Sequence, residues 1–234
     1  MASLALPGTV HAIEGAASNY VAVTAGYSEG EFDTSIKREL YSLTPEFGRI
    51  TSEYDLSASI PLYRLRLEGD GLSTTESGVG DVVLRAGRRL WQDAQARLSL
   101  GGSLSLKLAT GDDDAGLGTG ATDVGASVSV VRKSGNYSFT GLLGFVLTGD
   151  PSGIDYDNAV LYGVGVNRGY SRVNVFASLQ GQTAVVPGGD AALDVDVGFF
   201  HLLTLDHVVI AHVFMGLSDG SPDGGAGLGL VRWF

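Results

Sequence analysis

A strict alternation of apolar and polar residues runs from Leu98 to Leu108. Leucine occupies almost every second position, with Gly102 in register, and the positions between hold serine, glycine and Lys107. A period of two is typical of a β-strand with one apolar and one polar face. At about 3.3 Å per residue and a tilt near 45°, such a stretch covers roughly 25 Å, the height of the apolar band of a bilayer. The pattern therefore predicts a strand long enough to cross a membrane.

The same alternation recurs from Asn19 to Phe234. The predicted strands centre on residues 21–27, 41–47, 54–62, 82–90, 98–108, 124–130, 137–147, 160–166, 173–179, 193–199, 209–215 and 226–234. These are twelve strands, and single-chain bacterial outer-membrane barrels have an even number. The stretch from Val208 to Met215 is apolar on both faces, so the pattern alone does not fix its register.

The connections between these strands alternate in length. The long ones are 28–35, 66–77, 109–122, 148–158, 182–192 and 217–224, and the short ones fall near 48–49, 92–93, 133–136, 168–169 and 204–206. Outer-membrane barrels have long external loops and tight periplasmic turns, whereas a soluble β-sandwich has no reason to sort its loops in this way. Bare strand edges are costly in hydrocarbon, so the sheet must close. We therefore predict an all-β fold, a transmembrane antiparallel up-and-down barrel of about 12 strands.

Composition supports a single membrane domain without bound cofactors. The chain is 44% hydrophobic and 18% charged, and it has no cysteine. Its net charge of -11 disfavours a nucleic-acid partner. Ser3 to Val10 is a short apolar stretch, and residues 1–18 are interpreted as a signal-peptide remnant or a disordered leader. Residues 19–234 are predicted to form one outer-membrane barrel domain, and no metal or cofactor is expected.

If the leucine face meets lipid, the opposite face lines the lumen of a barrel about 24 Å across its backbone. The predicted inward cations are Arg85, Arg89, Lys107 and Arg172, and the predicted anions include Asp123 and Asp196. A second, apolar inward set comprises Leu142, Val146, Phe176, Phe200 and Phe214. The charges either select solutes or pair across the lumen and stabilise it, and both interpretations stay open. The apolar set indicates a path for hydrophobic substrates.

Aromatic and acidic residues also sort between the two ends. The predicted short turns are flanked by Phe47, Tyr54, Trp91, Tyr137, Tyr170, Trp233 and Phe234, as in an aromatic girdle at the membrane interface. Acidic residues crowd the long connections. Their spacing matches no EF-hand, so solvated loops are the simpler interpretation, with divalent bridging to lipopolysaccharide as the alternative.

The last eight residues, Gly227 to Phe234, resemble the terminal strand that the barrel-insertion machinery reads in bacterial outer-membrane proteins, although Arg232 stands where an aromatic residue is common. Several internal motifs narrow the resemblance, namely the runs 78–82, 107–112, 116–120, 149–151 with 155–158, and 216–223. They resemble, in the same order, those of the outer-membrane channel family linked to the meta-pathway of phenol degradation. Ala109 replaces the proline usual in that family.

The resemblance implies a narrow twelve-stranded channel in the outer membrane of a Gram-negative bacterium, with uptake of small hydrophobic or aromatic compounds. Lipid, lipopolysaccharide and small solutes are the expected partners. The alternatives are a structural or adhesion-type barrel without transport and an outer-membrane hydrolase. A hydrolase needs a positioned base. His212 is the one histidine well inside a predicted strand, and we expect it to have a structural role, so no catalytic residue is predicted.

Overall fold

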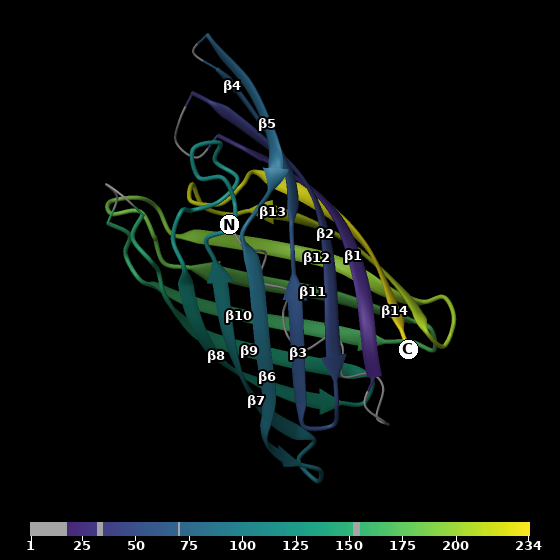
Figure 1. Ribbon diagram of the computed structural model, residues 1–234. Helices are drawn as coiled ribbons and strands as arrows, with labels where there is room; N and C mark the ends of the chain where they lie inside the picture. Colours follow the sequence, from purple (N-terminus) through teal and green to yellow (C-terminus); the bar gives the residue numbers. More distant parts are fainter. Residues whose placement is uncertain (1–17, 32–34, 70, 152–154) are drawn as a thin grey trace.

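The computed structural model describes residues 18–31, 35–69, 71–151 and 155–234 (Figure 1). The predicted leader therefore lies outside the described residues, except for Ser18. The strands are β1 (Ser18–Gly30), β2 (Lys37–Ile50), β3 (Tyr54–Ser59), β4 (Leu62–Gly69), β5 (Leu72–Val79), β6 (Val82–Asp93), β7 (Leu98–Leu108), β8 (Asp123–Ser134), β9 (Tyr137–Leu147), β10 (Ala159–Gly169), β11 (Val173–Gln182), β12 (Ala192–Leu202), β13 (His207–Gly216) and β14 (Gly224–Trp233). No helix among the described residues is long and apolar enough to cross a membrane.

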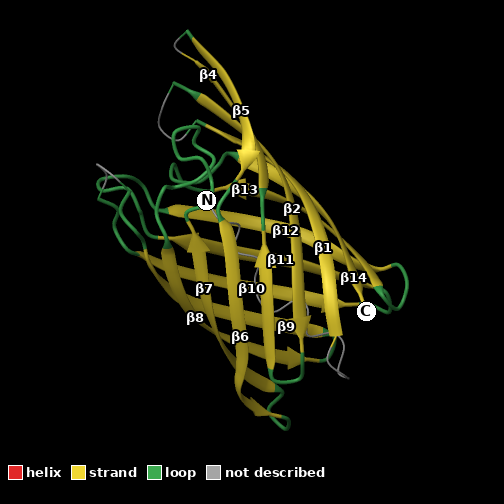
Figure 2. Ribbon diagram, in the orientation of Figure 1, coloured by secondary structure: helices red, strands yellow, loops and turns green. Residues whose placement is uncertain are grey.

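All fourteen strands belong to one antiparallel sheet that closes on itself (Figure 2). β14 pairs with β1, and β1 also pairs with β2, so the sheet has no open seam. β3 and β4 are two halves of one wall strand, interrupted at Ile60 and Pro61, and β5 and β6 are likewise interrupted at Gly80 and Asp81. The barrel therefore has twelve wall strands, which confirms the predicted fold class and strand number.

β4 and β5 continue past the barrel as a hairpin that also pairs with β2. Residues 66–77 were predicted to be a long loop, and that prediction is wrong. The hairpin turns beside Gly69 and Gly71, whose φ values of 146° and 79° suit glycine. Leu65 and Leu67 alternate with Arg66 and Glu68 in β4, but β5 is almost entirely polar, so the segment carries too little hydrophobic alternation to signal a hairpin.

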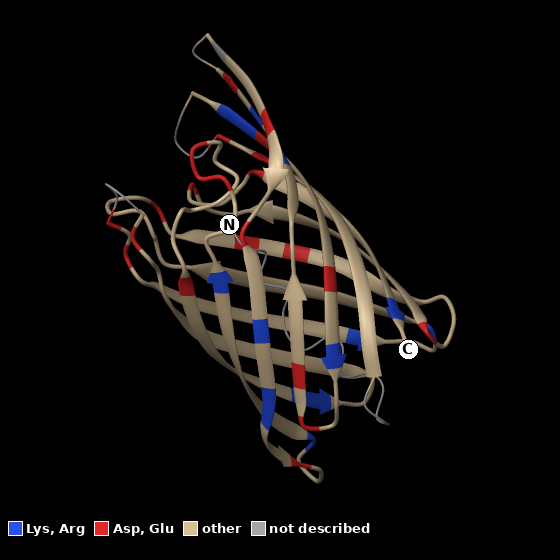
Figure 3. Cartoon of the chain, in the orientation of Figure 1, with Lys and Arg blue, Asp and Glu red and all other residues tan. Residues whose placement is uncertain are grey.

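A row of charges crosses the outer face of this hairpin near its tip. Lys37 Nζ lies 2.7 Å from Glu29 and 3.3 Å from Glu39, and Arg66 reaches Glu39 at 3.8 Å and also contacts Glu68. Such alternating pairs are stable in water and costly in hydrocarbon. They place this part of the barrel outside the apolar band, at the end that carries the long loops. Figure 3 shows acidic residues gathered in the loops at that end.

The outward positions of the wall form the lipid-facing surface. Leu104 is 61% exposed, and large apolar residues at alternate positions around the barrel are 37–61% exposed. This is the inverse of a water-soluble sandwich, which buries such side chains. At the short-turn end, an exposed aromatic girdle is formed by Phe47, Tyr54, Trp91, Tyr137, Tyr170 and Phe234. Trp233 was predicted to join it but faces inward, where its ring lies 5.1 Å from that of Tyr20.

Candidate functional site: the barrel lumen

One side of the lumen, formed by β7 and β8, is polar and made of small residues. The inward positions of β7 hold serine and glycine, followed by Lys107 at the end of the strand. Those of β8 also include glycine and serine, at Gly125, Ser127 and Ser129. Ser103 Oγ and Ser127 Oγ lie 2.7 Å apart across the two strands. These side chains leave space in the lumen because they are short, and they offer hydroxyl groups to a passing solute or to water.

Lys107 lies at the end of this polar wall and is compensated by two carboxylates. Its Nζ is 2.6 Å from Asp123 Oδ2 and 3.7 Å from Asp81 Oδ2, and it also contacts the Thr119 hydroxyl. The side chains of Lys107, Asp123 and Asp81 are 16%, 18% and 8% exposed. The sequence predicted Lys107 and Asp123 on the inner wall, and the structure places them there as an ion pair rather than as isolated charges.

Asp81 also holds the loop of residues 109–122 against the inner end of the wall. Its carboxylate accepts hydrogen bonds from the backbone N–H groups of Thr110 at 3.1 Å, Gly111 at 2.9 Å and Thr119 at 3.0 Å. The Thr119 hydroxyl donates to it at 3.3 Å. Leu117, at the tip of the loop, is only 5% exposed and lies beside Gly78. The loop is therefore folded back onto β5 and narrows this end of the lumen.

A second part of the lumen, on β9 and on β11 to β13, carries large apolar side chains among polar ones. Phe176 and Phe200 lie with their ring centroids 5.1 Å apart, and Leu142 is 7% exposed. Val146 points toward Gly125 on β8, and the Phe214 ring lies over Gly225 on β14. All five apolar residues predicted to line the path are thus at inward positions. Phe176 and Phe200 are in direct contact, on the neighbouring strands β11 and β12. Leu142 and Val146 lie across β10 on β9, and Phe214 pairs with Asp196, so polar residues interrupt the apolar lining.

Asp196 lies beside these apolar side chains and pairs with a histidine. Its Oδ2 is 2.8 Å from His212 Nδ1, and the His212 ring lies over Gly227, where a larger residue would clash. The Oδ1 atoms of Asp196 and its neighbour Asp194 are buried without a hydrogen-bond partner in the described part of the chain. An unpaired buried carboxylate oxygen is costly, so water or a solute with a hydrogen-bond donor is expected there.

The predicted arginines divide between the wall and a turn. Arg85 and Arg89 occupy inward positions of β6, between exposed outward neighbours, and Arg89 Nη1 donates to Gln92 at 2.9 Å. β6 and β12 are six wall strands apart, so Arg85 and Asp196 lie on opposite walls. Arg172 does not belong to the wall. It lies exposed in the turn before β11, because that strand begins one residue later, at Val173.

Sequence reasoning missed several inward residues, among them Asp81, Tyr20 and Glu46. Asp81 ends a glycine-rich motif, but only the folded loop reveals its role as an anchor. Tyr20 donates a hydrogen bond to Glu46 at 2.5 Å, and its ring lies over Gly48 of the next strand. The alternation with Val21 and Phe47 is the signal that could have placed Tyr20 and Glu46 inside. No group of three or more metal-ligating side chains occurs in the described ranges.

A closed barrel that is apolar outside and lined by polar groups, paired charges and several apolar side chains is a transmembrane barrel of the bacterial outer membrane. The sequence narrows this class. Residues 16–234 match the family model described as "Putative MetA-pathway of phenol degradation", and the chain belongs to that family. No curated protein matches the sequence.

Solved structures share the fold at low sequence identity. The translocator domain of autotransporter NalP from Neisseria meningitidis is 13% identical, with 96% of this chain and 90% of that chain covered and a TM-score of 0.60. The KdgM porin is 7% identical, with 92% and 99% covered and a TM-score of 0.61. The CymD monoaromatic hydrocarbon channel is 8% identical, with 95% and 89% covered and a TM-score of 0.50. These likenesses concern the fold.

Proposed function

We propose that the chain is a passive outer-membrane channel for small molecules, chiefly hydrophobic or aromatic ones, and that it performs no chemistry of its own. The observation that carries the proposal is the set of large apolar side chains inside the lumen, centred on the Phe176–Phe200 ring pair and including Leu142, Val146 and Phe214. A wall that only stabilised the barrel or conducted ions would favour polar groups. Rings at 5.1 Å present faces and edges against which a small aromatic solute can stack.

The polar wall opposite these side chains supports the same proposal. A small aromatic solute with a hydroxyl or carboxyl group has one apolar and one polar side, and the lumen offers a matching pair of surfaces. The folded loop 109–122 sets an upper limit on size, because it narrows the lumen near Asp81. The family's description in terms of phenol degradation agrees with solutes of this kind.

Uptake into liposomes tests the proposal. Purified protein reconstituted into liposomes should admit monoaromatic compounds faster than sugars of similar mass, and carboxylates at an intermediate rate. Protein-free liposomes supply the background, which is substantial for apolar solutes. Equal permeation of all three classes would contradict the proposed preference. A rate no higher than background for every solute would indicate a structural or adhesion-type barrel instead.

Two further partners are proposed. The C-terminal strand β14 closes the barrel against β1, and its resemblance to other outer-membrane proteins supports recognition by the barrel-insertion machinery. The acidic long loops support bridging to lipopolysaccharide phosphates through divalent cations. Replacement of Phe234 by alanine should lower the assembled fraction of the protein in outer membranes, and chelation should release lipopolysaccharide from the purified barrel.

A further inference from the structure

The outer wall carries a groove at the seam between β1 and β14. Val21, Val23, Leu230, Arg232 and Phe234 line it, and its volume is about 320 Å³. Val23 pairs with Leu230, and Val21 pairs with Arg232, so the groove follows the direction of the strands. Its apolar side chains are 40–63% exposed on the lipid-facing surface. The groove is therefore apolar along most of its length and has one cation near the short-turn end.

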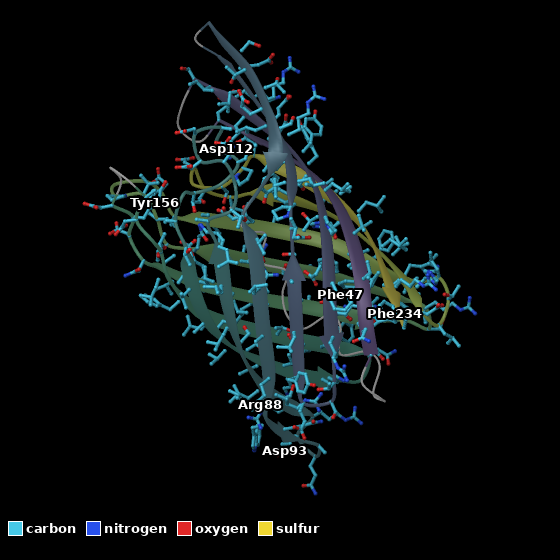
Figure 4. The ribbon with its side chains drawn as sticks, in the orientation of Figure 1. Phe47, Arg88, Asp93, Asp112, Tyr156 and Phe234 are labelled. Atoms are coloured by element: carbon cyan, nitrogen blue, oxygen red, sulfur yellow. The ribbon has the colours of Figure 1, made fainter. Side chains whose placement is uncertain are left out.

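A second arginine, Arg49, also faces outward. It lies on β2, which flanks β1 on the side opposite β14. Val21 pairs with Phe47, and Asn19 pairs with Arg49 of β2. Asn19 also exchanges two backbone hydrogen bonds with Phe234, both 3.0 Å long. Arg49 and Arg232 thus lie on strands two spacings, or about 10 Å, apart. Figure 4 shows Phe47 and Phe234 on this side of the barrel.

Neither guanidinium has a side-chain partner among the residues that the structure describes. The described residues supply no side-chain hydrogen bond or ion pair to Arg49 or Arg232. Arg168, at the same end of the barrel, differs, because its guanidinium lies over the rings of Tyr137 and Tyr170 at 5.2 and 5.1 Å. An arginine at the edge of the hydrocarbon is costly unless an anion or water compensates it. The two arginines therefore provide a site for an anionic group at the depth of the aromatic girdle.

We propose that this groove binds one glycerophospholipid of the periplasmic leaflet. The phosphate lies between Arg49 and Arg232, and an acyl chain follows Val21, Val23 and Leu230 along the seam. Guanidinium is well suited to phosphate because it donates two parallel hydrogen bonds. The short turns put this end of the barrel in the periplasmic leaflet, away from lipopolysaccharide. The inference is independent of what the lumen transports.

A second copy of the chain is a poorer occupant of the groove. A twofold dimer places the same patch of both copies face to face, so Arg232 would approach its own symmetry mate. Like charges in a medium of low dielectric repel each other strongly. A phospholipid instead brings both the missing negative charge and the apolar surface.

Native mass spectrometry of the detergent-solubilised barrel tests the proposal, with palmitoyl-oleoyl phosphatidylglycerol and phosphatidylethanolamine as probes. The unmodified chain should retain one phospholipid. The double variant Arg49→Gln/Arg232→Gln should lower the bound fraction at least about tenfold, since each charge-assisted hydrogen bond contributes more than a neutral one. Leu230→Trp, which fills the groove and leaves the charges unchanged, should also lower it. Unboiled electrophoresis confirms that each variant is a folded barrel.

Arg132→Gln is the matched control, because Arg132 is an exposed, outward-facing arginine. It lies on β8 at the same short-turn end of the barrel as Arg49 and Arg232. It should retain the phospholipid as the unmodified chain does. Equal retention by the double variant, or an equal loss in the control, would overturn the proposal. So would an adduct with the mass of lipid A in place of the phospholipid, or a dimer that disappears when the two arginines are replaced.

Discussion

The Nζ of Lys107 lies 2.6 Å from the Oδ2 of Asp123, on the neighbouring strand and inside the lumen. The sequence left open whether the inward charges select solutes or pair with one another. This contact shows that Lys107, at least, is paired. Pairing and selection are compatible, because removal of one partner leaves the charge of the other facing the pore.

Replacement of the inward cations should therefore shift ion selectivity toward cations. For Lys107→Gln the carboxylates of Asp81 and Asp123 lose their counter-ion. One unit charge at about 6 Å in water corresponds to roughly 0.7 kcal/mol, or about a threefold change in the permeability ratio. Reversal potentials across a salt gradient measure it, and Arg85→Gln and Arg89→Gln should shift them in the same direction.

Arg88→Gln is the control for these variants, since Arg88 is exposed on the outer face of β6, between the two inward arginines. It should leave the reversal potential unchanged. Unchanged potentials in the variants of Arg85, Arg89 and Lys107 would show that these side chains do not line the conducting path.

Asp81→Ala should release the loop 109–122 from the wall. The variant loses an acceptor of four hydrogen bonds, and a hydrogen bond to a charged group contributes about 1.5–3 kcal/mol. We expect a larger single-channel conductance and more gating noise. Asp114→Ala removes an exposed charge from the same loop and should change neither. If both variants conduct like the unmodified chain, the loop does not restrict the pore.

Phe176→Ala and Phe200→Ala should weaken the preference for aromatic solutes. Each variant removes one ring of the pair inside the lumen, and such contacts contribute about 0.5–1.5 kcal/mol. The ratio of monoaromatic to sugar uptake should fall by roughly two- to tenfold, while sugar uptake stays equal or rises. Phe145→Ala, on the lipid-facing side of β9, is the control. A ratio that falls equally in the control would point to a general effect on the barrel.

Gly48→Ala should destabilise the barrel, because the added Cβ would occupy the position of the Tyr20 ring. Tyr20 is 9% exposed and is held by Glu46, so it cannot move away freely. Overpacking of this kind costs about 1–3 kcal/mol in the free energy of unfolding. Gly141→Ala meets no neighbouring atom and should stay within about 0.5 kcal/mol. Urea unfolding in lipid vesicles gives both values.

The alternation of residues was sufficient to predict the wall of the barrel. A strand that separates lipid from lumen must place apolar residues such as Leu104 outside and polar residues such as Ser103 inside. The sequence therefore predicts which face of the strand is turned to the lipid. The same constraint located Phe176 and Phe200 on the inner face. It left β13 open, because that strand is apolar on both faces, and the structure places Val213 and Met215 outward and Phe214 inward.

Outside the membrane this constraint disappears. The hairpin of β4 and β5 extends past the apolar band, so residues 66–77 are mostly polar and have the composition of a loop although they form strands. The residue at which β11 begins is set by the short turn before it, and the alternation does not show where that turn ends. Arg172 was therefore wrongly assigned to the wall, although β11 begins at Val173. The contact between Asp81 and Thr119 joins residues that are far apart in the sequence, and no local pattern encodes it.

Planar-bilayer recording of the purified chain tests the central claim most directly, namely that the closed barrel encloses a continuous path. We expect discrete, small conductance steps that grow in Asp81→Ala. Heat-modifiable migration in electrophoresis shows whether the protein is folded. If the unmodified chain and Asp81→Ala are both folded by this test and neither conducts at any voltage, the account is contradicted.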